Sequence, residues 1–388
     1  MEFIHFIVDD KFLNDTICLF NSIDIINNRY IIVTHKTEFT YLKDDFIEIV
    51  NKDQASAIIS NPKSCDALFI HGLSSLNYDI IELVHPKICV FWFSWGYDIY
   101  SNRYPQFKLI KIHHRIKTEH LSYSIAKAIY KEEFKDFLKR LLGKDKFYKD
   151  KFISGINRID FYSGVFPMEY EMLKLHKFFK AAPVRFNYPT PKGIFNTDKI
   201  IHANLPTGQN IQVGNSASLL CNHCYILNLL KKCDTGEKKI IVPLSYQKNE
   251  DYVDYVCKKG YSYFGKRFIP IKEFIPYKEY QELLSSVAFS VYGYKQQASV
   301  GNILLNIRSG VKIFLPQKSF NYIHFKKIGY KVCTIEHDLA NEIQHPLSEQ
   351  EVYDNRSILI KYSTDEIYEN NILNIVNKVK AFKARIAI

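Results

Sequence analysis

The stretch NIQVGNSASLLCNHCYILNLLKKCDTGEKKIIVPLSY, residues 210–246, indicates the fold of the second half of the chain. Short apolar runs lie at 210–214 and 239–242, and an amphipathic segment at 218–232 separates them. A strand, a helix and a second strand in this order are typical of a parallel sheet, because parallel neighbours need a crossover connection. The alternation continues, with predicted strands at 268–271, 287–292 and 312–315 and predicted helices at 251–259, 277–285 and 301–309. We therefore expect an α/β domain here.

The first half of the chain alternates in a similar way. Its predicted strands lie at 3–8, 30–34, 46–50, 67–71 and 88–93, and its clearest helical segments at 54–60 and 77–84. Four prolines and two glycines fall within residues 181–209, which show no helical period and so indicate a linker. We expect two Rossmann-like domains facing a cleft, an N-terminal one at 1–185 and a C-terminal one at 210–364. The linker is 186–209, and a C-terminal helix at 365–388 could pack on either domain.

Composition and charge limit the class of protein. The 388 residues are 47% hydrophobic and 24% charged, which excludes a disordered or collagen-like chain, and the net charge of +11 suits an anionic partner. The most apolar run, 88–95, is far shorter than the ~18–20 residues that cross a bilayer. The acidic N-terminus predicts a first strand and not a signal peptide, and eight scattered cysteines predict reduced thiols.

Residues 105–152 are the most basic part of the chain, with 13 Lys and Arg against 6 Asp and Glu. Apolar residues at 130, 134, 137, 138 and 141 share one face of a predicted helix near 126–142. Such a helix could lie on an anionic membrane surface, or its apolar side could pack on the N-terminal sheet. A nucleic-acid partner is not expected, because no nucleic-acid-binding motif accompanies the charge.

Four predicted strands end in glycines or polar residues. These ends are His71-Gly72, residues 94–100, Gly214-Asn215-Ser216 and residues 243–246. Ligands of open α/β sheets bind at the carboxyl ends of the strands, so these positions are candidates for a ligand site. Turns and caps are also found at strand ends, and that interpretation stays open for each of them.

The loop QQASVGN, residues 296–302, follows a predicted strand and opens a predicted helix. A loop of small residues at a helix start leaves N–H groups and the positive end of the helix dipole available to a phosphate. Lys295 precedes the loop and could add a full charge. Neither the P-loop motif nor the dinucleotide motif G-x-G-x-x-G is present. The alternative is an ordinary N-cap formed by Ser299.

In these blocks the sequence resembles the TDP-N-acetylfucosamine:lipid II N-acetylfucosaminyltransferases of bacterial surface-polysaccharide assembly. The similar blocks keep their order from about residue 67 to 335. They are H-G at 71–72, W-G-x-D-x-Y at 95–100, V-G-N-S at 213–216 with N-H at 222–223, V-P-x-x-Y at 242–246, F-x-x-Y-x-x-L-L from 277 with Tyr in the Phe place, Q-Q at 296–297 and a small-residue helix start at Gly301. Several blocks in one order are far more specific than any single block.

The resemblance implies a GT-B glycosyltransferase. Its donor would be a nucleotide sugar such as dTDP-Fuc4NAc, bound by the C-terminal domain, and its acceptor a polyprenyl-diphosphate-linked glycan, bound by the N-terminal domain. The expected location is the cytoplasmic face of the bacterial inner membrane, as a peripheral protein on its anionic surface. The alternative from another class is a non-catalytic two-lobed protein that binds a nucleotide or a sugar.

Four residues are candidates for the acceptor side. Glycosyl transfer needs a base for the acceptor hydroxyl, and Asp98 is the first candidate and His71 the second. Trp95 and Tyr100 could stack on sugar faces. The alternatives are a carboxylate that caps a turn, a histidine buried at a strand end, and aromatic rings of the core.

The donor side has ten candidates. They are Gly214, Asn215, Ser216, Tyr246, Lys295, Gln296, Gln297, Ser299, Gly301 and Asn302. Among them, backbone N–H groups, Lys295 and Gln297 would offset the charge of a departing diphosphate. No cofactor is expected, and no metal, because no Asp-x-Asp motif ends a strand and the cluster Cys221-Asn222-His223-Cys224 lacks a second ligand pair at zinc spacing.

Overall fold

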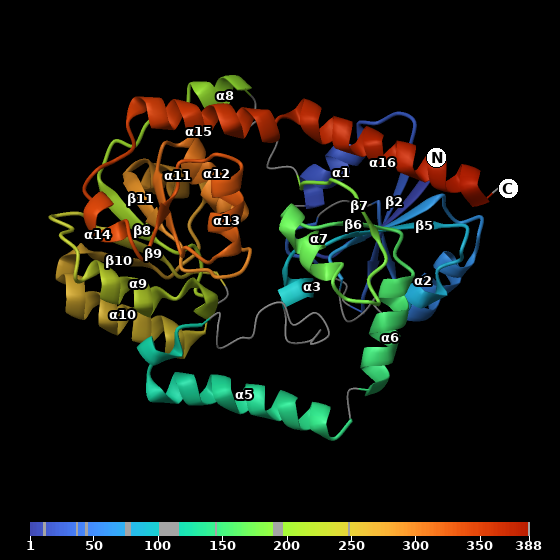
Figure 1. Cartoon of the computed structure of the whole chain (residues 1–388), viewed down its shortest axis with the longest axis horizontal. Helices are drawn as coiled ribbons and strands as arrows, with labels where there is room; N and C mark the ends of the chain where they lie inside the picture. The colour runs from blue at the N-terminus through green and yellow to red at the C-terminus, as the bar shows by residue number, and fades with distance from the viewer. Residues whose placement is uncertain are drawn as a thin grey trace. The chain divides into compact units, whose positions relative to one another are not determined.

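The computed structural model describes residues 1–10, 13–35, 38–42, 46–73, 79–100, 116–143, 146–188, 197–246 and 249–386. The chain forms two compact units (Figure 1). Unit 1 comprises Met1–Leu109, Lys139–Phe195 and Ser363–Ile388, and unit 2 comprises Ile110–Leu138 and Asn196–Tyr362. Each unit has its own parallel sheet and its own hydrophobic core.

Unit 1 contains a seven-stranded parallel sheet in the order β3-β2-β1-β4-β5-β6-β7. Its strands are β1 (Glu2–Phe6), β2 (Asn27–Val33), β3 (Ile47–Val50), β4 (Ala67–His71), β5 (Cys89–Phe93), β6 (Phe161–Ser163) and β7 (Ala182–Pro183). The chain adds β2 and β3 on one side of β1 and the later strands on the other. The carboxyl ends of β1 and β4 therefore form the switch point at which such sheets bind ligands.

Helices cover both faces of this sheet, which explains why β4 and β5 are continuous apolar runs, ALFIH and CVFWF, and not alternating ones. The helices are α1 (Leu13–Asn21), α2 (Lys52–Ser60), α3 (Tyr97–Tyr100), α6 (Lys146–Asn157), α7 (Pro167–Leu173) and α16 (Asp365–Ile386), with a 3-10 turn, η1, at Ile81–Leu83. The C-terminal helix α16 buries Ile372, Ile375, Val376 and Val379, which share one helix face, against rings of the sheet such as Phe91.

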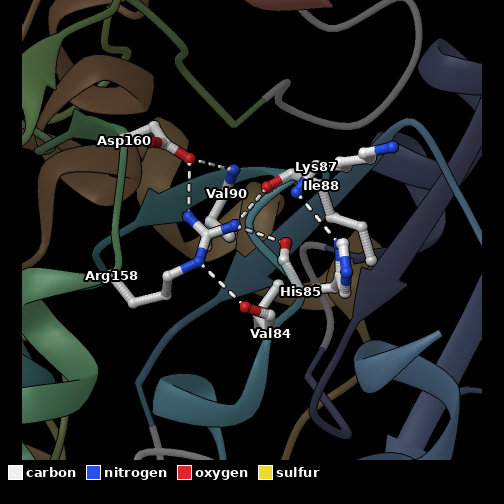
Figure 2. Close-up of polar contacts among 7 residues, drawn as sticks. All are labelled: Val84, His85, Lys87, Ile88, Val90, Arg158 and Asp160. Carbon is white, nitrogen blue, oxygen red and sulfur yellow. Dashed lines mark hydrogen bonds and ion pairs between the residues drawn. The ribbon is translucent and has the colours of Figure 1, made fainter. Parts of the chain in front are cut away.

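A partly buried ion pair fixes the opposite, amino end of this sheet (Figure 2). The guanidinium of Arg158 donates to the carbonyls of Val84, His85 and Ile88 at 3.0, 2.8 and 2.5 Å, and to Asp160 Oδ2 at 2.9 Å. The same carboxylate oxygen accepts from the N–H of Val90 at 2.8 Å. Arg158 thus joins the turn before β5 to the start of β6, and its role is structural.

Unit 2 contains a six-stranded parallel sheet in the order β10-β9-β8-β11-β12-β13. Its strands are β8 (Asn210–Val213), β9 (Ile240–Pro243), β10 (Phe268–Ile271), β11 (Val287–Val291), β12 (Lys312–Leu315) and β13 (Cys333–Thr334). The order reverses between β8 and β11, so the switch point of this sheet lies at the carboxyl ends of these two strands.

Figure 1 shows α9 and α10 on one face of the unit 2 sheet and α11 and α12 on the other. The helices are α5 (Tyr123–Leu141), α8 (Thr197–Ile201), α9 (His223–Leu230), α10 (Glu250–Phe264), α11 (Tyr277–Ser285), α12 (Val300–Arg308), α13 (Phe320–Lys327), α14 (Leu339–Glu342) and α15 (Glu349–Tyr362), with 3-10 turns η2 (Thr118–His120), η3 (Leu219–Cys221) and η4 (Gly265–Arg267). Of α5, the part up to Leu138 belongs to unit 2.

The division of the chain differs from the expected one in two places. Residues 110–138 group with unit 2, because Ile125 is buried in its core and the N–H of Lys117 donates to Asn222 Oδ1 at 2.7 Å. The C-terminal helix groups with unit 1. The expected linker 186–209 contributes its first ten residues to unit 1 and the others to unit 2.

Two predicted helices also differ. The segment 218–232 is a 3-10 turn followed by α9, because Asn222 between them adopts a left-handed conformation, with φ 53° and ψ 38°. Of the helix expected at 77–84, the described residues form only the 3-10 turn η1, and residues 77–78 lie outside the described part. Strands β6, β7 and β13 have no more than three residues each and were not predicted. Among the residues the structure describes, no helix combines the length and the apolar character needed to span a bilayer.

Candidate functional site

Polar residues of the loops that follow β8 and β11 meet at the switch point of unit 2. Asn215 Oδ1 accepts hydrogen bonds from Tyr294 Oη at 3.0 Å and from Ser299 Oγ at 2.5 Å. Tyr294 Oη in turn accepts from Cys221 Sγ at 2.8 Å and lies 3.3 Å from Ser216 Oγ. Three of the predicted donor residues, Asn215, Ser216 and Ser299, are therefore joined in one network, with the Tyr294 hydroxyl at its centre.

Ser299 occupies the N-cap position of α12, but it does not cap the helix with its side chain. Its backbone is left-handed, with φ 58° and ψ 21°, and its hydroxyl is directed to Asn215. A left-handed conformation is unfavourable for a residue with a Cβ and is found most often where a site requires it. The first N–H groups of α12, those of Val300, Gly301 and Asn302, thus remain available at the carboxyl edge of the sheet.

The loop between β11 and α12 is fixed from α13. Asn321 Nδ2 donates to the carbonyl of Ala298 at 2.8 Å, and the N–H of Phe320 donates to the carbonyl of Lys295 at 3.3 Å. Gln296 and Gln297 are both buried in this loop. The Oε1 atom of Gln297 is buried without a hydrogen-bond partner among the described residues, so this oxygen remains available to a donor group of a ligand.

A buried amide holds α12 on the sheet. Asn306 Nδ2 donates to Ser290 Oγ at 2.8 Å and to Tyr292 Oη at 2.9 Å, and all three groups are buried. Gln212 of β8 donates from Nε2 to the carbonyl of Gly214 at 2.8 Å. These bonds fix the axis of α12 and the start of the loop after β8, so the N-terminus of the helix has a defined position relative to Asn215.

Two lysines place positive charge near this loop. Burial lowers the pKa of the half-buried Lys295, and the charge of Lys117 lowers it further, partly offset by Glu119 and Glu336. Lys117 reaches this region because Asn222 accepts from its N–H and donates to the carbonyl of Gly293 at 2.8 Å. Its ammonium is 3.5 Å from Glu119 and lies over the ring of Tyr225. Two neighbouring ammonium groups suit a ligand with more than one negative charge.

Tyr246 lies in the loop that follows β9. Its ring is half exposed, and its carbonyl accepts from the N–H of Ala217 at 2.7 Å. The structure therefore places Tyr246 beside the loop that follows β8, where a ring could contact a ligand held by Asn215 and Ser216.

Gly214 begins this loop with φ +65°, a conformation that glycine adopts without strain. A Cβ at this position would be 2.7 Å from His223 Nε2. Burial lowers the pKa of His223 to about 3, so its ring is neutral. Within the cluster at 221–224, Cys221, His223 and Cys224 are all buried. Cys221 Sγ donates to Tyr294 Oη, His223 Nδ1 lies 3.0 Å from Tyr252 Oη, and Cys224 packs in the apolar core. Among the described residues, no group of three or more His, Cys, Asp or Glu side chains could hold a metal ion.

In unit 1, Asp98 has the alternative, structural role and is not placed to act as a base. It is fully buried, and its carboxylate accepts from the N–H of Leu73 at 2.9 Å, from Trp92 Nε1 at 2.8 Å and from the N–H of Trp95 at 3.0 Å. Burial raises its pKa to about 6, although these hydrogen bonds favour the charged form. The carboxylate ties together the segments after β4 and β5, and none of its surface is exposed.

His71 is likewise buried and neutral, because burial and its neighbour His5 hold its pKa well below the usual value. A chain of hydrogen bonds fixes its tautomer. Asn28 Nδ2 donates to the carbonyl of Phe20, so its Oδ1 accepts from His5 Nε2 at 3.1 Å. His5 Nδ1 then accepts from His71 Nε2 at 2.9 Å, and His71 Nδ1 accepts from Tyr188 Oη at 2.9 Å. His71 therefore positions the Tyr188 hydroxyl, and the expectation that it is a base is not supported.

Of the two predicted stacking residues, only Trp95 remains at the surface. Its indole is partly exposed and meets Tyr188 and Tyr97 edge-on, at centroid distances of 5.1 and 6.4 Å. Tyr100 is buried, and its hydroxyl donates to Glu169 Oε1 at 2.8 Å. Tyr100 therefore belongs to the core, as the alternative interpretation held.

Two carboxyl groups, those of Asp9 and Asp10, lie a few residues past the end of β1 at the switch point of unit 1. Burial alone would raise the pKa of Asp9, but its bonds from the N–H groups of Thr40, Tyr41 and Leu42 outweigh this and lower it. Asp9 is thus engaged in holding a loop. Asp10 is partly exposed, and its charge adds to burial in raising the pKa of Tyr188 well above the usual value.

Residues 177–365 match the family model described as 4-alpha-L-fucosyltransferase glycosyl transferase group 56. The match spans just under half of the chain and includes every donor-side candidate. In structure, the chain is similar to the lipopolysaccharide outer core galactosyltransferase WaaB, with a TM-score of 0.61, 10% identity and coverage of 97% of this chain and 99% of that one. The fold is GT-B. The family match and the fold identify the chain as a glycosyltransferase.

Other structural neighbours share this fold at equally low identity. Anabaena HepE, solved in complex with UDP and glucose, has a TM-score of 0.60 at 8% identity and covers 97% of this chain and all of that one. A glycosyltransferase from Rickettsia africae has a TM-score of 0.60 at 8% identity, covering 97% and 98%. The glycosyltransferase assignment contradicts the alternative expectation of a non-catalytic binding protein.

The structure adds three candidate site residues of this glycosyltransferase that were not identified from the sequence: Tyr294, Asp10 and Lys117. Tyr294 could have been found, because it lies at a strand end beside a glycine, between two blocks already singled out. Asp10 could also have been found, because it lies just past the strand predicted at 3–8. Lys117 carries no local signal, because its contact with Asn222 joins positions 105 residues apart.

Proposed function

We propose that this glycosyltransferase moves a deoxy-acetamido sugar such as Fuc4NAc from a dTDP-sugar to a lipid-linked oligosaccharide during the synthesis of a bacterial surface polysaccharide. The sequence blocks and the match to a fucosyltransferase family support a deoxyhexose as the transferred sugar. The UDP and glucose complex of HepE supports a nucleotide-sugar donor for this fold. The location proposed is the cytoplasmic face of the inner membrane, where the acceptor would be held.

The observation that carries the proposal is the site at the N-terminus of α12. Ser299 directs its hydroxyl to Asn215 and leaves the first-turn N–H groups available, and the helix dipole adds partial positive charge at the same point. Lys295 and Lys117 supply two full charges nearby. A diphosphate bound here would receive backbone, amide and ammonium donors, which is the set that stabilises a phosphate leaving group without a metal.

Asn215 would bind the donor directly. Its Oδ1 accepts from two hydroxyl groups of the protein, which turns its Nδ2 away from them. We infer that this Nδ2 donates to a phosphate or sugar oxygen of the donor. Tyr246, half exposed beside the same loop, would border the nucleobase.

In the proposed reaction, the acceptor oxygen forms a bond to the anomeric carbon of the sugar as the bond from that carbon to the diphosphate oxygen breaks. The electron pair of the broken bond remains on the diphosphate, where the donors at α12 stabilise it. The proton of the acceptor hydroxyl passes to a base of unit 1. We assign this role to Asp10, which follows the central strand β1 and is partly exposed, in place of Asp98 and His71.

The proposal is tested by nucleotide specificity. Thermal stabilisation by dTDP, UDP, GDP and ADP is compared first, followed by release of dTDP from dTDP-Fuc4NAc in the presence of a lipid-linked acceptor. We expect dTDP to stabilise most and the dTDP-sugar to turn over fastest. Stabilisation by none of the four nucleotides would refute the donor site. Selective use of a UDP-sugar or GDP-sugar would retain the site and refute the donor identity.

A further inference from the structure

Helix α5 exposes a row of large apolar side chains. Tyr130, Phe134, Phe137 and Leu141 are 50%, 59%, 54% and 71% exposed, and Leu138 and Leu142 are exposed as well. Their spacing places them on one face of the helix. A single exposed apolar residue is ordinary in a folded protein, but a contiguous row of this kind indicates a surface that binds a partner.

The opposite face of α5 attaches the helix to unit 2. Ile125 is buried in the core of that unit, and Ile129 packs against it. Ile125 and Phe134 are nine residues apart, so at about 3.6 residues per turn they lie on opposite sides of the helix. The apolar row therefore faces away from the core that holds α5. One interpretation of the sequence was that this apolar row packs on the N-terminal sheet. The structure contradicts it, because the rings of the row are exposed.

The charges of α5 are distributed unevenly about this row. Lys127, Lys131 and Lys135 follow one another at intervals of four residues along its edge and are exposed. The acidic residues Glu132 and Asp136 lie almost opposite Phe134, on the attached side, whereas Glu133 lies four residues before Phe137 and flanks the other edge of the row. Glu132 pairs with Lys135 at 2.6 Å, an exposed pair that contributes little to stability. The exposed face is thus aromatic at its centre and basic along one edge.

We propose that α5 lies in the surface of an anionic bilayer, with its aromatic row among the acyl chains and its lysines at the phosphate groups. This inference rests on the proposed function, since a lipid-linked acceptor is held in such a bilayer. Aromatic rings are suited to the headgroup boundary, and lysine stems extend from an apolar surface to phosphates. A protein partner or a second copy of the chain would need no row of lysines beside the apolar face, so the charge favours the bilayer.

Vesicle flotation of the full-length protein tests the proposal. We expect binding to vesicles of phosphatidylcholine mixed with phosphatidylglycerol, and weaker binding to vesicles of phosphatidylcholine alone. Phe134→Ser/Leu141→Ser should lower the partition coefficient by more than about tenfold. Lys131→Gln/Lys135→Gln should lower it by about fivefold per lysine on anionic vesicles only, since a lysine near the surface adds about that factor.

The chain offers matched controls for both variants. Leu175 and Phe274 are 80% and 86% exposed outside α5, and Leu175→Ser/Phe274→Ser should leave vesicle binding unchanged. Lys63→Gln/Lys87→Gln removes two exposed lysines elsewhere and should have the same null effect. Equal losses in the control and α5 variants would overturn the proposal, because binding would then be unspecific.

Two further outcomes separate this proposal from others. If the wild type does not float but sediments as a dimer that Phe134→Ser/Leu141→Ser dissociates, α5 is a protein interface and the proposal is refuted. Thermal stabilisation by dTDP is measured on the same variants without vesicles. If the α5 variants lose flotation but still bind dTDP, the result supports the proposal for α5. If no form of the protein binds dTDP, the proposed function is refuted, and the flotation result still tests the proposal for α5.

Discussion

Ser299 combines a strained backbone with a hydrogen bond to a residue of the proposed donor site, and two substitutions separate the two effects. Ser299→Ala removes the 2.5 Å bond to Asn215 but keeps the left-handed backbone at φ 58°. Ser299→Gly removes the same bond and relieves the strain. A partly buried hydrogen bond contributes about 1 kcal/mol to the free energy of unfolding. Left-handed backbone costs about 1–2 kcal/mol for a residue with a Cβ, and glycine loses about 0.5–1 kcal/mol more entropy on folding.

The two variants should therefore differ in stability but not in donor binding. We expect Ser299→Ala to lower the free energy of unfolding by about 1 kcal/mol and Ser299→Gly to leave it near the wild-type value. Urea denaturation measures both. In either variant Asn215 loses one of the two groups that orient it, so KM for the donor should rise by about fivefold, as expected for a loss of about 1 kcal/mol of binding free energy. Equal stability of the two variants would refute the strain, and an unchanged KM in both would refute the part of the hydroxyl in donor binding.

Four further predictions follow from the same geometry. Asp10→Asn should lower kcat by about 10²–10⁴-fold with little change in stability. Asp98→Asn should change stability and leave kcat of the folded enzyme within about twofold. The reverse pattern would restore Asp98 as the base. Burial raises the folded-state pKa of Asp98 from 3.8 to about 6, so the folded state binds more protons than the unfolded state between these pH values. The free energy of unfolding should therefore fall as pH rises from about 4 to 6. Urea denaturation should show a flatter slope for Asp98→Asn. Gly214→Ala should lower the melting temperature more than Gly143→Ala. Both glycines have φ +65°, but only the Cβ at 214 would meet a neighbour, His223 Nε2 at 2.7 Å. Equal shifts would show that the site tolerates the added methyl group. Lys117→Ala should raise KM for the dTDP-sugar by about tenfold at low salt and by less at high salt, since salt screens an exposed charge; a KM that does not depend on salt would contradict an electrostatic role.

The sequence was sufficient to predict the two parallel sheets and most strands, because buried central strands are continuous apolar runs. The runs of β4 and β5 could be recognised without a partner, whereas β7 and β13 have two residues each and gain their strand character only from the neighbour they pair with. The break at Asn222 was not predictable, since the left-handed residue is held by bonds to Lys117 and Gly293, which are distant in sequence.

The candidate sites differed in how far the sequence could define them. At the donor side, the residues lie on two strand ends and one helix start that are neighbours in the sheet order, so motifs separated in sequence meet in space. At the acceptor side, an aspartate after a strand could be either exposed or enclosed, and the local sequence around Asp98 does not distinguish the two. The indole of Trp92 and the N–H of Leu73, which enclose that carboxylate, come from β5 and from the segment after β4.

The segment that leads into α5 connects the two proposals for unit 2. Asn222 fixes the backbone of Lys117, Lys259 Nζ donates to the carbonyl of His120 at 3.0 Å, and Ile125 is buried in the core. Residues 117–125 are therefore held to the same unit by three independent contacts, with a lysine of the proposed donor site at one end and the apolar row of α5 beginning just past the other. A surface that binds α5 would thus bind the unit that contains the proposed donor site. If both proposals hold, the basic segment contributes to donor binding and to membrane binding through one attachment.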